Sequence, residues 1–154
     1  MKFETEISEK SSPKEYCNWE EVEELTRIVA DKIRRSNKKY DAILAITKGG
    51  IIPARLMARE LDIDCIQLIP VRDKKLHKEE MPLLLKDKKY LIIDEIYDTG
   101  DIFYKVYEAV RMFDCDFAFL MSRYERISSS SNSSKRTYIG KVLNHNKWIV
   151  FPWE

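Results

Sequence analysis

Apolar residues recur along this chain with two different periods. Helical spacing, in which apolar positions three or four residues apart stand among charged ones, marks residues 19–36, 54–61 and 101–113. Short apolar runs of strand length lie between and after these segments, at 40–46, 64–69, 89–94 and 116–121. Two further extended pieces, 137–143 and 148–151, close the chain. Strands that alternate with helices predict an α/β fold, in which helices cover both faces of a parallel sheet.

The remaining segments show neither period. Residues 1–17 are polar and are predicted to be an N-terminal extension. Residues 70–82, "PVRDKKLHKEEMP", are highly charged and bounded by prolines, which indicates a mobile loop or a short hairpin. Residues 128–134, "SSSSNSS", predict a flexible surface loop. At 154 residues, the whole chain 1–154 fits one domain with a core of its own.

The charge and the apolar content of the chain exclude some classes of binding partner. Lysine and arginine number 27 against 26 for aspartate and glutamate, so a net charge of +1 offers no footprint for nucleic acid or for anionic lipid. No segment approaches the roughly 20 apolar residues of a membrane span, and we expect a cytoplasmic protein. The cysteines at 17, 65 and 115 lie outside any metal or redox spacing and are expected to be reduced packing residues.

The stretch "YLIIDEIYDTG", 90–100, concentrates the candidate chemistry. Its apolar strand runs into Asp94, Glu95 and Asp98, at the end of the strand where parallel sheets bind ligands. The helix that begins after Thr99 and Gly100 offers unpaired N–H groups to an anion. Together they indicate a sugar phosphate, with carboxylates for ribose hydroxyls or a metal and amides for the phosphate. The alternative is a capped strand–helix turn whose acids are simply solvated.

Three stretches resemble one family. "YLIIDEIYDTG" resembles the phosphoribosyl pyrophosphate (PRPP) motif of type I phosphoribosyltransferases, and "ILAITKGGIIPARLMARELDI", 43–63, is similar to that family's first strand, pyrophosphate loop and following helix. The ending "NKWIVFPWE" resembles the C-terminal segment of bacterial xanthine-guanine phosphoribosyltransferases. The resemblance implies a type I phosphoribosyltransferase fold with a small C-terminal hood. It also implies transfer of a 5-phosphoribosyl group from PRPP to a purine.

The resemblance assigns two anion sites. The pyrophosphate loop would comprise Thr47, Lys48, Gly49 and Gly50, with a cis peptide after Thr47 as in relatives. Two glycines let the backbone approach an anion closely and the lysine adds charge, although an ordinary Gly-Gly turn remains the alternative. The 5′-phosphate would bind to the five residues that open the next helix, which are Asp98, Thr99, Gly100, Asp101 and Ile102.

The resemblance also assigns the sugar, the metal and the base. Asp94 and Glu95 would hold ribose hydroxyls and the cofactor Mg²⁺, largely through those hydroxyls or water, and Asp98 would be the general base or acid. Base-binding residues would be Arg123, Trp148 and Ile149, with the tryptophan as the stacking surface. From the residues alone, Trp148 is also readable as a core or interface aromatic and Arg123 as a surface arginine.

Three departures from the family pattern bear on function. Ile102 replaces a hydroxyl residue, loop 70–82 lacks an expected Ser-Tyr pair, and Arg123 replaces a lysine that donates to the purine 6-oxo group. Loop 70–82 would close over PRPP and exclude water, or would be a plain solvated loop.

The expected function is therefore purine salvage. PRPP and guanine, xanthine or hypoxanthine would give a nucleoside 5′-monophosphate and pyrophosphate, in a homodimer or homotetramer without nucleic-acid or membrane partners. The alternatives are a phosphoribosyltransferase for another base, such as adenine, and a regulator that binds PRPP or a nucleotide without catalysis.

Overall fold

A five-stranded parallel sheet forms the centre of the computed structural model, which describes residues 13–127 and 135–154. The strand order is β3-β2-β6-β7-β8, and every neighbouring pair is parallel. Its strands are β2 (Ala42–Ile46), β3 (Ile66–Ile69), β6 (Lys89–Tyr97), β7 (Asp114–Ser122) and β8 (Thr137–Val142). The predicted α/β class is confirmed, while the serine-rich loop and residues 1–12 lie outside the described residues.

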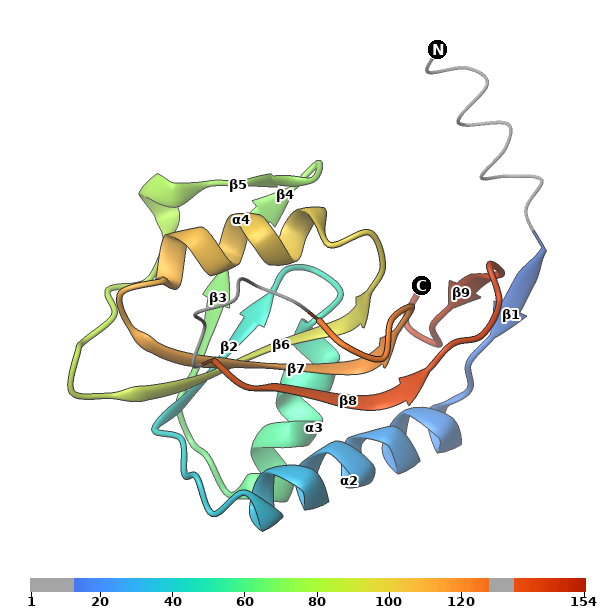
Figure 1. Ribbon diagram of the computed structural model, residues 1–154, viewed down its shortest axis with the longest axis horizontal. Coiled ribbons are helices and arrows are strands. Elements are labelled where there is room, and N and C mark those ends of the chain that lie inside the picture. Colours follow the sequence, from blue (N-terminus) through green and yellow to red (C-terminus); the bar gives the residue numbers. More distant parts are fainter. Residues whose placement is uncertain (1–12, 128–134) are drawn as a thin grey trace.

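Helices cover both faces of this sheet (Figure 1). On one face lie α2 (Trp19–Arg35) and α3 (Ile51–Leu61), and on the other lies α4 (Asp101–Val110). Side chains alternate accordingly along each strand: Leu91 and Ile93 pack with α2 and α3, whereas Ile92 packs with α4. The near-continuous apolar runs of the sequence are therefore explained by burial on both sides.

The helix ends follow local sequence chemistry. The Asn18 side chain accepts a hydrogen bond from the backbone N–H of Glu21 at 2.8 Å, which caps α2. Helix α3 starts at Ile51, three residues before the predicted start, and α4 ends at Val110 instead of residue 113. Within 13–127 and 135–154, none of the helices combines the length and apolar content that crossing a membrane requires.

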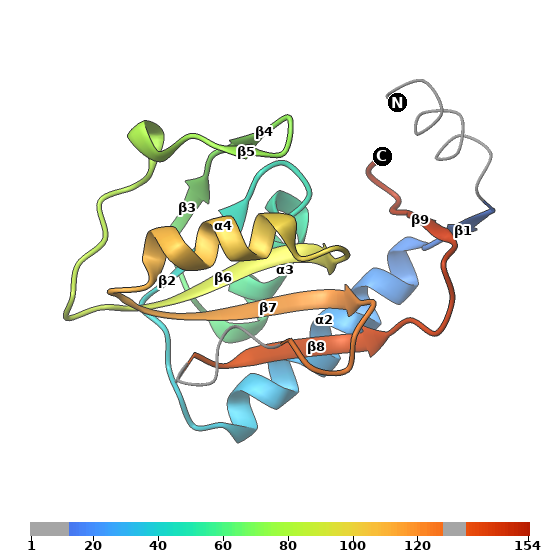
Figure 2. The ribbon, with the colours of Figure 1, turned by 45° about the horizontal axis from the view of Figure 1, so that its top comes forward.

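Two small sheets accompany the main one. Strands β1 (Lys14–Tyr16) and β9 (Trp148–Val150) pair in parallel, so segments far apart in the sequence lie side by side, as Figure 2 shows; we call this pair the hood. The second is the hairpin of β4 (Val71–Arg72) and β5 (Lys75–Leu76), followed by the short helix η1 (Lys78–Glu80). Strand β1 falls in the segment for which the sequence predicted no element.

Besides the apolar residues on the two faces of the sheet, a further apolar cluster joins the hood to the sheet. Its members include Cys17, Leu120, Leu143, Ile149 and Phe151. Burial raises the pKa of the Cys17 and Cys115 thiols to about 12, which keeps them protonated and unreactive. The prediction of packing is confirmed for these two cysteines, but it is wrong for Cys65, which is exposed.

Candidate active site

Most of the predicted site residues meet at the carboxyl ends of β2 and β6. One cavity of about 390 Å³ lies between the end of β6, the start of α4 and the hood. The predicted residues on its wall are Asp94, Glu95, Asp98, Thr99, Gly100, Asp101, Ile102 and Trp148. The predicted residues that are absent from this wall are Thr47, Lys48, Gly49, Gly50, Arg123 and Ile149. The topology therefore brings the residues predicted for the sugar and the 5′-phosphate to one opening, together with Trp148 from the predicted base site.

A second cavity, of about 500 Å³, lies on the other side of the acid pair. Thr47, Lys48 and Gly49 line it from the loop after β2, and Arg72 and Lys74 line it from the hairpin. The two cavities share Ile46, Lys74, Asp94, Glu95 and Ile102 as walls. A ligand with an anionic group at each end can therefore lie across the acid pair with one end in each cavity.

The loop after β2 has the predicted backbone. The Thr47–Lys48 peptide bond is cis, as the resemblance implied. The Thr47 hydroxyl accepts from the backbone N–H of Val71 at 3.0 Å, which fixes the loop to the start of the hairpin. A Cβ on Gly50 would lie 2.3 Å from the carbonyl oxygen of Ile93, so only glycine fits there.

The two acids of β6 are adjacent and largely withdrawn from water. The backbone N–H of Glu95 donates to Asp94 Oδ1 at 2.8 Å. Burial, and then the neighbouring Glu95 carboxylate, raise the pKa of Asp94 well above its usual range. Burial and the charge of Glu154 raise the pKa of Glu95 to about 7. A crowded pair of carboxyl groups is stabilised by a cation, and oxygen ligands of this kind fit Mg²⁺.

The turn before α4 has the form of an anion cradle. Gly100 has a φ of +93°, and a Cβ there would lie 2.6 Å from the Tyr97 hydroxyl. The backbone N–H of Asp101 donates to Thr99 Oγ1 at 3.3 Å. Ile102 packs against the apolar core and forms part of the wall of both cavities, so no hydroxyl is offered at this position.

Asp98 and Arg123 form an ion pair at the rim, with Arg123 Nε 3.1 Å from Asp98 Oδ1. Arg123 Nη1 donates to the carbonyl of His145 at 2.9 Å, and Nη2 donates to that of Lys147 at 2.8 Å. The Arg123 side chain is only 13% exposed, so the reading of a plain surface arginine is wrong. Donation to a 6-oxo group stays a prediction.

Trp148 is the first residue of β9 and faces the cavity. The residue is 43% exposed, which leaves its ring available to a flat ligand and argues against a core aromatic. Its backbone N–H donates to the carbonyl of Pro13 at 2.9 Å. The side chain of Ile149, by contrast, is buried in the apolar cluster between the hood and the sheet, so this residue can meet a base only through its backbone. Trp153 stacks on Phe151 with ring centres 5.0 Å apart and is therefore a packing residue.

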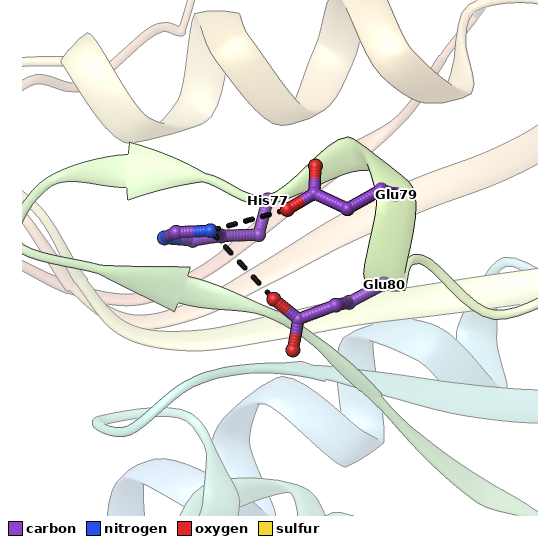
Figure 3. A group of neighbouring side chains, drawn as sticks. All are labelled: His77, Glu79 and Glu80. Carbon is purple, nitrogen blue, oxygen red and sulfur yellow. Dashed lines mark ion pairs between the residues drawn. The ribbon is translucent and has the colours of Figure 1, made fainter.

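Residues 70–82 are folded as the hairpin, one of the two predicted outcomes. Lys105 of α4 donates to the carbonyl of Lys74 at 2.7 Å and holds the hairpin tip beside both cavities. His77 Nδ1 lies 3.4 Å from Glu79 Oε1 and 3.6 Å from Glu80 Oε2. Figure 3 shows both carboxylates turned toward the imidazole ring. Glu80 also pairs with Arg72. The sequence identified the charges of this loop but not the position of Lys74, because only the hairpin turn brings it to the site.

Comparison with known proteins shows the family of this chain. The sequence model of the phosphoribosyl transferase domain matches residues 13–154. The xanthine-guanine phosphoribosyltransferase of Cereibacter sphaeroides is 28% identical, over 90% of this chain and 86% of that protein. The enzyme of the same name from Nitratidesulfovibrio vulgaris strain DP4 is 30% identical, over 75% of this chain and 69% of that protein.

Solved structures resemble the fold closely. The purine phosphoribosyltransferase of Pyrococcus horikoshii has a TM-score of 0.68 and 28% identity, over 92% of this chain and 94% of that one. A protein from Neisseria gonorrhoeae with bound ppGpp has a TM-score of 0.74 at 22% identity, over 93% and 90% of the two chains. The latter is evidence for the fold alone.

Proposed function

This chain belongs to the phosphoribosyl transferase family and is a phosphoribosyltransferase, and its relatives include enzymes that are named for purines. From that premise we propose that the base it uses is a 6-oxopurine. PRPP and guanine, xanthine or hypoxanthine would give the nucleoside 5′-monophosphate and pyrophosphate. The observation that carries the proposal is the arrangement of the two cavities. Trp148 and Asp98 line the first cavity together with the acid pair, and the same acid pair lines the second cavity with Lys48 and Gly49.

Each anionic part of PRPP has a matching wall. The turn from Thr99 to Ile102 would bind the 5′-phosphate, and the loop after β2 would bind pyrophosphate. Asp94 and Glu95 stand between these sites, where the ribose hydroxyls would lie, and the same two acids would hold Mg²⁺. The ion, when bound, would neutralise charge on the departing pyrophosphate.

The reaction breaks the bond between C1 of the ribose and pyrophosphate and forms a bond from C1 to a purine nitrogen. The base loses a proton, and Asp98 would receive it. The half-exposed carboxylate of Asp98 on the cavity wall supports this role. Trp148 would stack on the purine ring without reading its edge. Lys74, which lines both cavities, would lie against the bound PRPP.

The choice of a 6-oxopurine is supported by relatives that are named for xanthine and guanine. Arg123 has five N–H donors and gives three to Asp98, His145 and Lys147, so a 6-oxo group would meet only the remaining hydrogens. A transferase for adenine would differ only in the groups that meet the 6-position of the base. Family membership favours catalysis over a regulator that merely binds PRPP. A cytoplasmic homodimer or homotetramer remains part of the proposal.

The test is a coupled assay with PRPP, Mg²⁺ and, in turn, guanine, xanthine, hypoxanthine and adenine. We expect nucleoside monophosphate from the 6-oxopurines and little from adenine. Trp148→Ala should cost about 1–3 kcal/mol in kcat/KM for every purine alike, because stacking reads only the ring face. Trp19→Ala, an exposed tryptophan outside both cavities, is the matched control. A preference for adenine would overturn the base assignment, and no product from any base would overturn the proposed transfer.

A further inference from the structure

Arg123 connects the acid at the cavity rim to the segment that carries the stacking tryptophan. We propose that it is a positioning residue, which holds Asp98 and the hood in a fixed relation so that base and proton acceptor meet correctly. This inference rests on the proposed function, because it gives Asp98 and Trp148 the roles assigned above. It departs from the expectation that Arg123 reads the purine edge.

The first part of the argument is the geometry of the guanidinium. Its Nε, Nη1 and Nη2 atoms each donate to a different partner, at 3.1, 2.9 and 2.8 Å. Because the guanidinium is planar and rigid, three simultaneous bonds fix the partners relative to one another. The backbone N–H of Arg123 also donates to the carbonyl of Tyr97 at 3.0 Å, so the arginine is anchored to the strand end that precedes Asp98.

The second part is what lies beyond the two carbonyls. His145 and Lys147 belong to the segment that joins β8 to β9, directly before Trp148. The backbone N–H of Lys147 donates to His145 Nδ1 at 3.1 Å, and His145 Nε2 lies 3.1 Å from a carboxylate oxygen of Glu15 in β1. The segment is therefore tied to both strands of the hood, and movement of Arg123 would move the hood.

The third part is burial. The Arg123 side chain is 13% exposed, whereas Asp98 is 48% exposed. A mostly buried charge needs its hydrogen-bond partners, so the guanidinium is expected to keep Asp98 and the two carbonyls as its acceptors. A lysine at this position would carry the charge to Asp98, but one ammonium group lacks the planar fork that reaches two carbonyls as well.

The experiment combines kinetics with hydrogen exchange on the full chain. Arg123→Met should lower kcat by about 100-fold for all four purines alike, the loss expected when a reacting group is misplaced by about 1 Å. Amide exchange in residues 143–150 should become faster. Arg123→Lys should recover part of the lost kcat and little of the lost exchange protection. Arg126→Met, an exposed arginine three residues along the chain, is the matched control and should behave as wild type.

A double-mutant cycle separates positioning from general destabilisation. If Arg123 acts through Asp98, Arg123→Met should reduce kcat much less in an Asp98→Asn background than in the wild type. Fully additive losses would overturn the proposal, as would unchanged exchange in 143–150. A loss confined to 6-oxopurines would instead identify Arg123 as a direct reader of the base.

The outcomes also separate this proposal from the proposed function. If the wild type transfers no phosphoribosyl group to any base, the proposed function fails. The exchange arm still tests the tie between Arg123 and the hood in that case. Thermal unfolding checks that each variant is folded. If Arg123→Met does not fold, the kinetic and exchange measurements are made on Arg123→Lys, which keeps the charge.

Discussion

Glu95 and Gly49 meet at the boundary between the two cavities. A Cβ on Gly49 would lie 1.5 Å from Glu95 Oε2, whereas a Cβ on Gly50 would meet the backbone carbonyls of Ile93 and Ile46 at 2.3 and 2.7 Å. The obstacle at Gly49 is the end of a flexible side chain, and the obstacle at Gly50 is the sheet itself. Adjacent glycines therefore answer to different constraints.

Alanine at these two glycines should separate the constraints. Gly50→Ala should lower the free energy of unfolding by about 1–3 kcal/mol, because backbone atoms of two strands must shift to accept the methyl group. Gly49→Ala should cost clearly less, because the Glu95 side chain can rotate away. Urea unfolding of both variants measures the difference. Equal losses would contradict the distinction between the two positions.

The Glu95 carboxyl should make stability depend on pH. Its pKa is about 7 in the folded chain against 4.5 for the unperturbed group, so between these values the folded state binds more protons than the unfolded one. Stability should therefore fall as pH rises from about 4.5 to 7, and the raised pKa of Asp94 acts in the same direction. Glu95→Gln should flatten this slope, measured as urea midpoints at several pH values. Glu24→Gln, on an exposed part of α2, should leave it unchanged.

Asp98→Asn tests the proton acceptor. The amide keeps the size of the side chain and the phosphate cradle, so PRPP binding should change little while kcat falls by about 10²–10⁴-fold. Single-turnover rates and PRPP titration measure the two separately. Asp87→Asn, an exposed aspartate before β6, is the matched control. Turnover at the wild-type rate in Asp98→Asn would remove the general-base role.

At the scale of elements, the sequence was sufficient where the pattern is local. Periodicity placed α2, α4 and the strands of the main sheet to within a few residues, because each element buries its own apolar positions. It missed β1, since Lys14–Tyr16 is polar and becomes a strand only by pairing with β9, more than a hundred residues away. A short polar strand of this kind cannot be predicted from its own residues, because it forms only by pairing with a strand that is distant in the sequence.

Residues 70–82 were predicted to be a mobile loop or a short hairpin, and the structure shows the hairpin. Its tip is held to α4 by the bond from Lys105 to the carbonyl of Lys74, so Lys105→Met should make amide exchange in residues 72–76 about five-fold faster, the equivalent of about 1 kcal/mol. The KM for PRPP should rise, because Lys74 lines both cavities. Lys86→Met, on an exposed turn, is the control. Exchange unchanged by Lys105→Met would show that other contacts hold the tip.

At the scale of the whole molecule, the two ends of the sheet do different work. The candidate site lies at the carboxyl ends of the strands. The motifs around Asp94 and Gly49 indicated it from sequence, because most of its residues are neighbours in the chain. The amino ends carry a buried polar network centred on Asp116, which no motif indicated. Its partners Lys38, Tyr40 and Arg136 lie far from it in sequence, so only the fold brings them together.

Asp116 and Asp114 provide a matched test of what this network contributes to stability. Both accept from Lys38 Nζ at 2.7 Å, but the Asp116 side chain is 2% exposed and Asp114 is 41% exposed. Asp116 also accepts from the Tyr40 hydroxyl at 2.5 Å and from the backbone N–H of Arg136 at 2.8 Å. Asp116→Ala should therefore lower the free energy of unfolding by about 3–5 kcal/mol, since it leaves buried donors without an acceptor. Asp114→Ala should cost less than about 1 kcal/mol, because water replaces an exposed partner. Urea unfolding followed by tryptophan fluorescence measures both, and kcat per folded molecule should stay constant because the network lies at the opposite end of the sheet from the site. Similar losses in the two variants would mean that the bond to Lys38, and not burial, sets the contribution of Asp116.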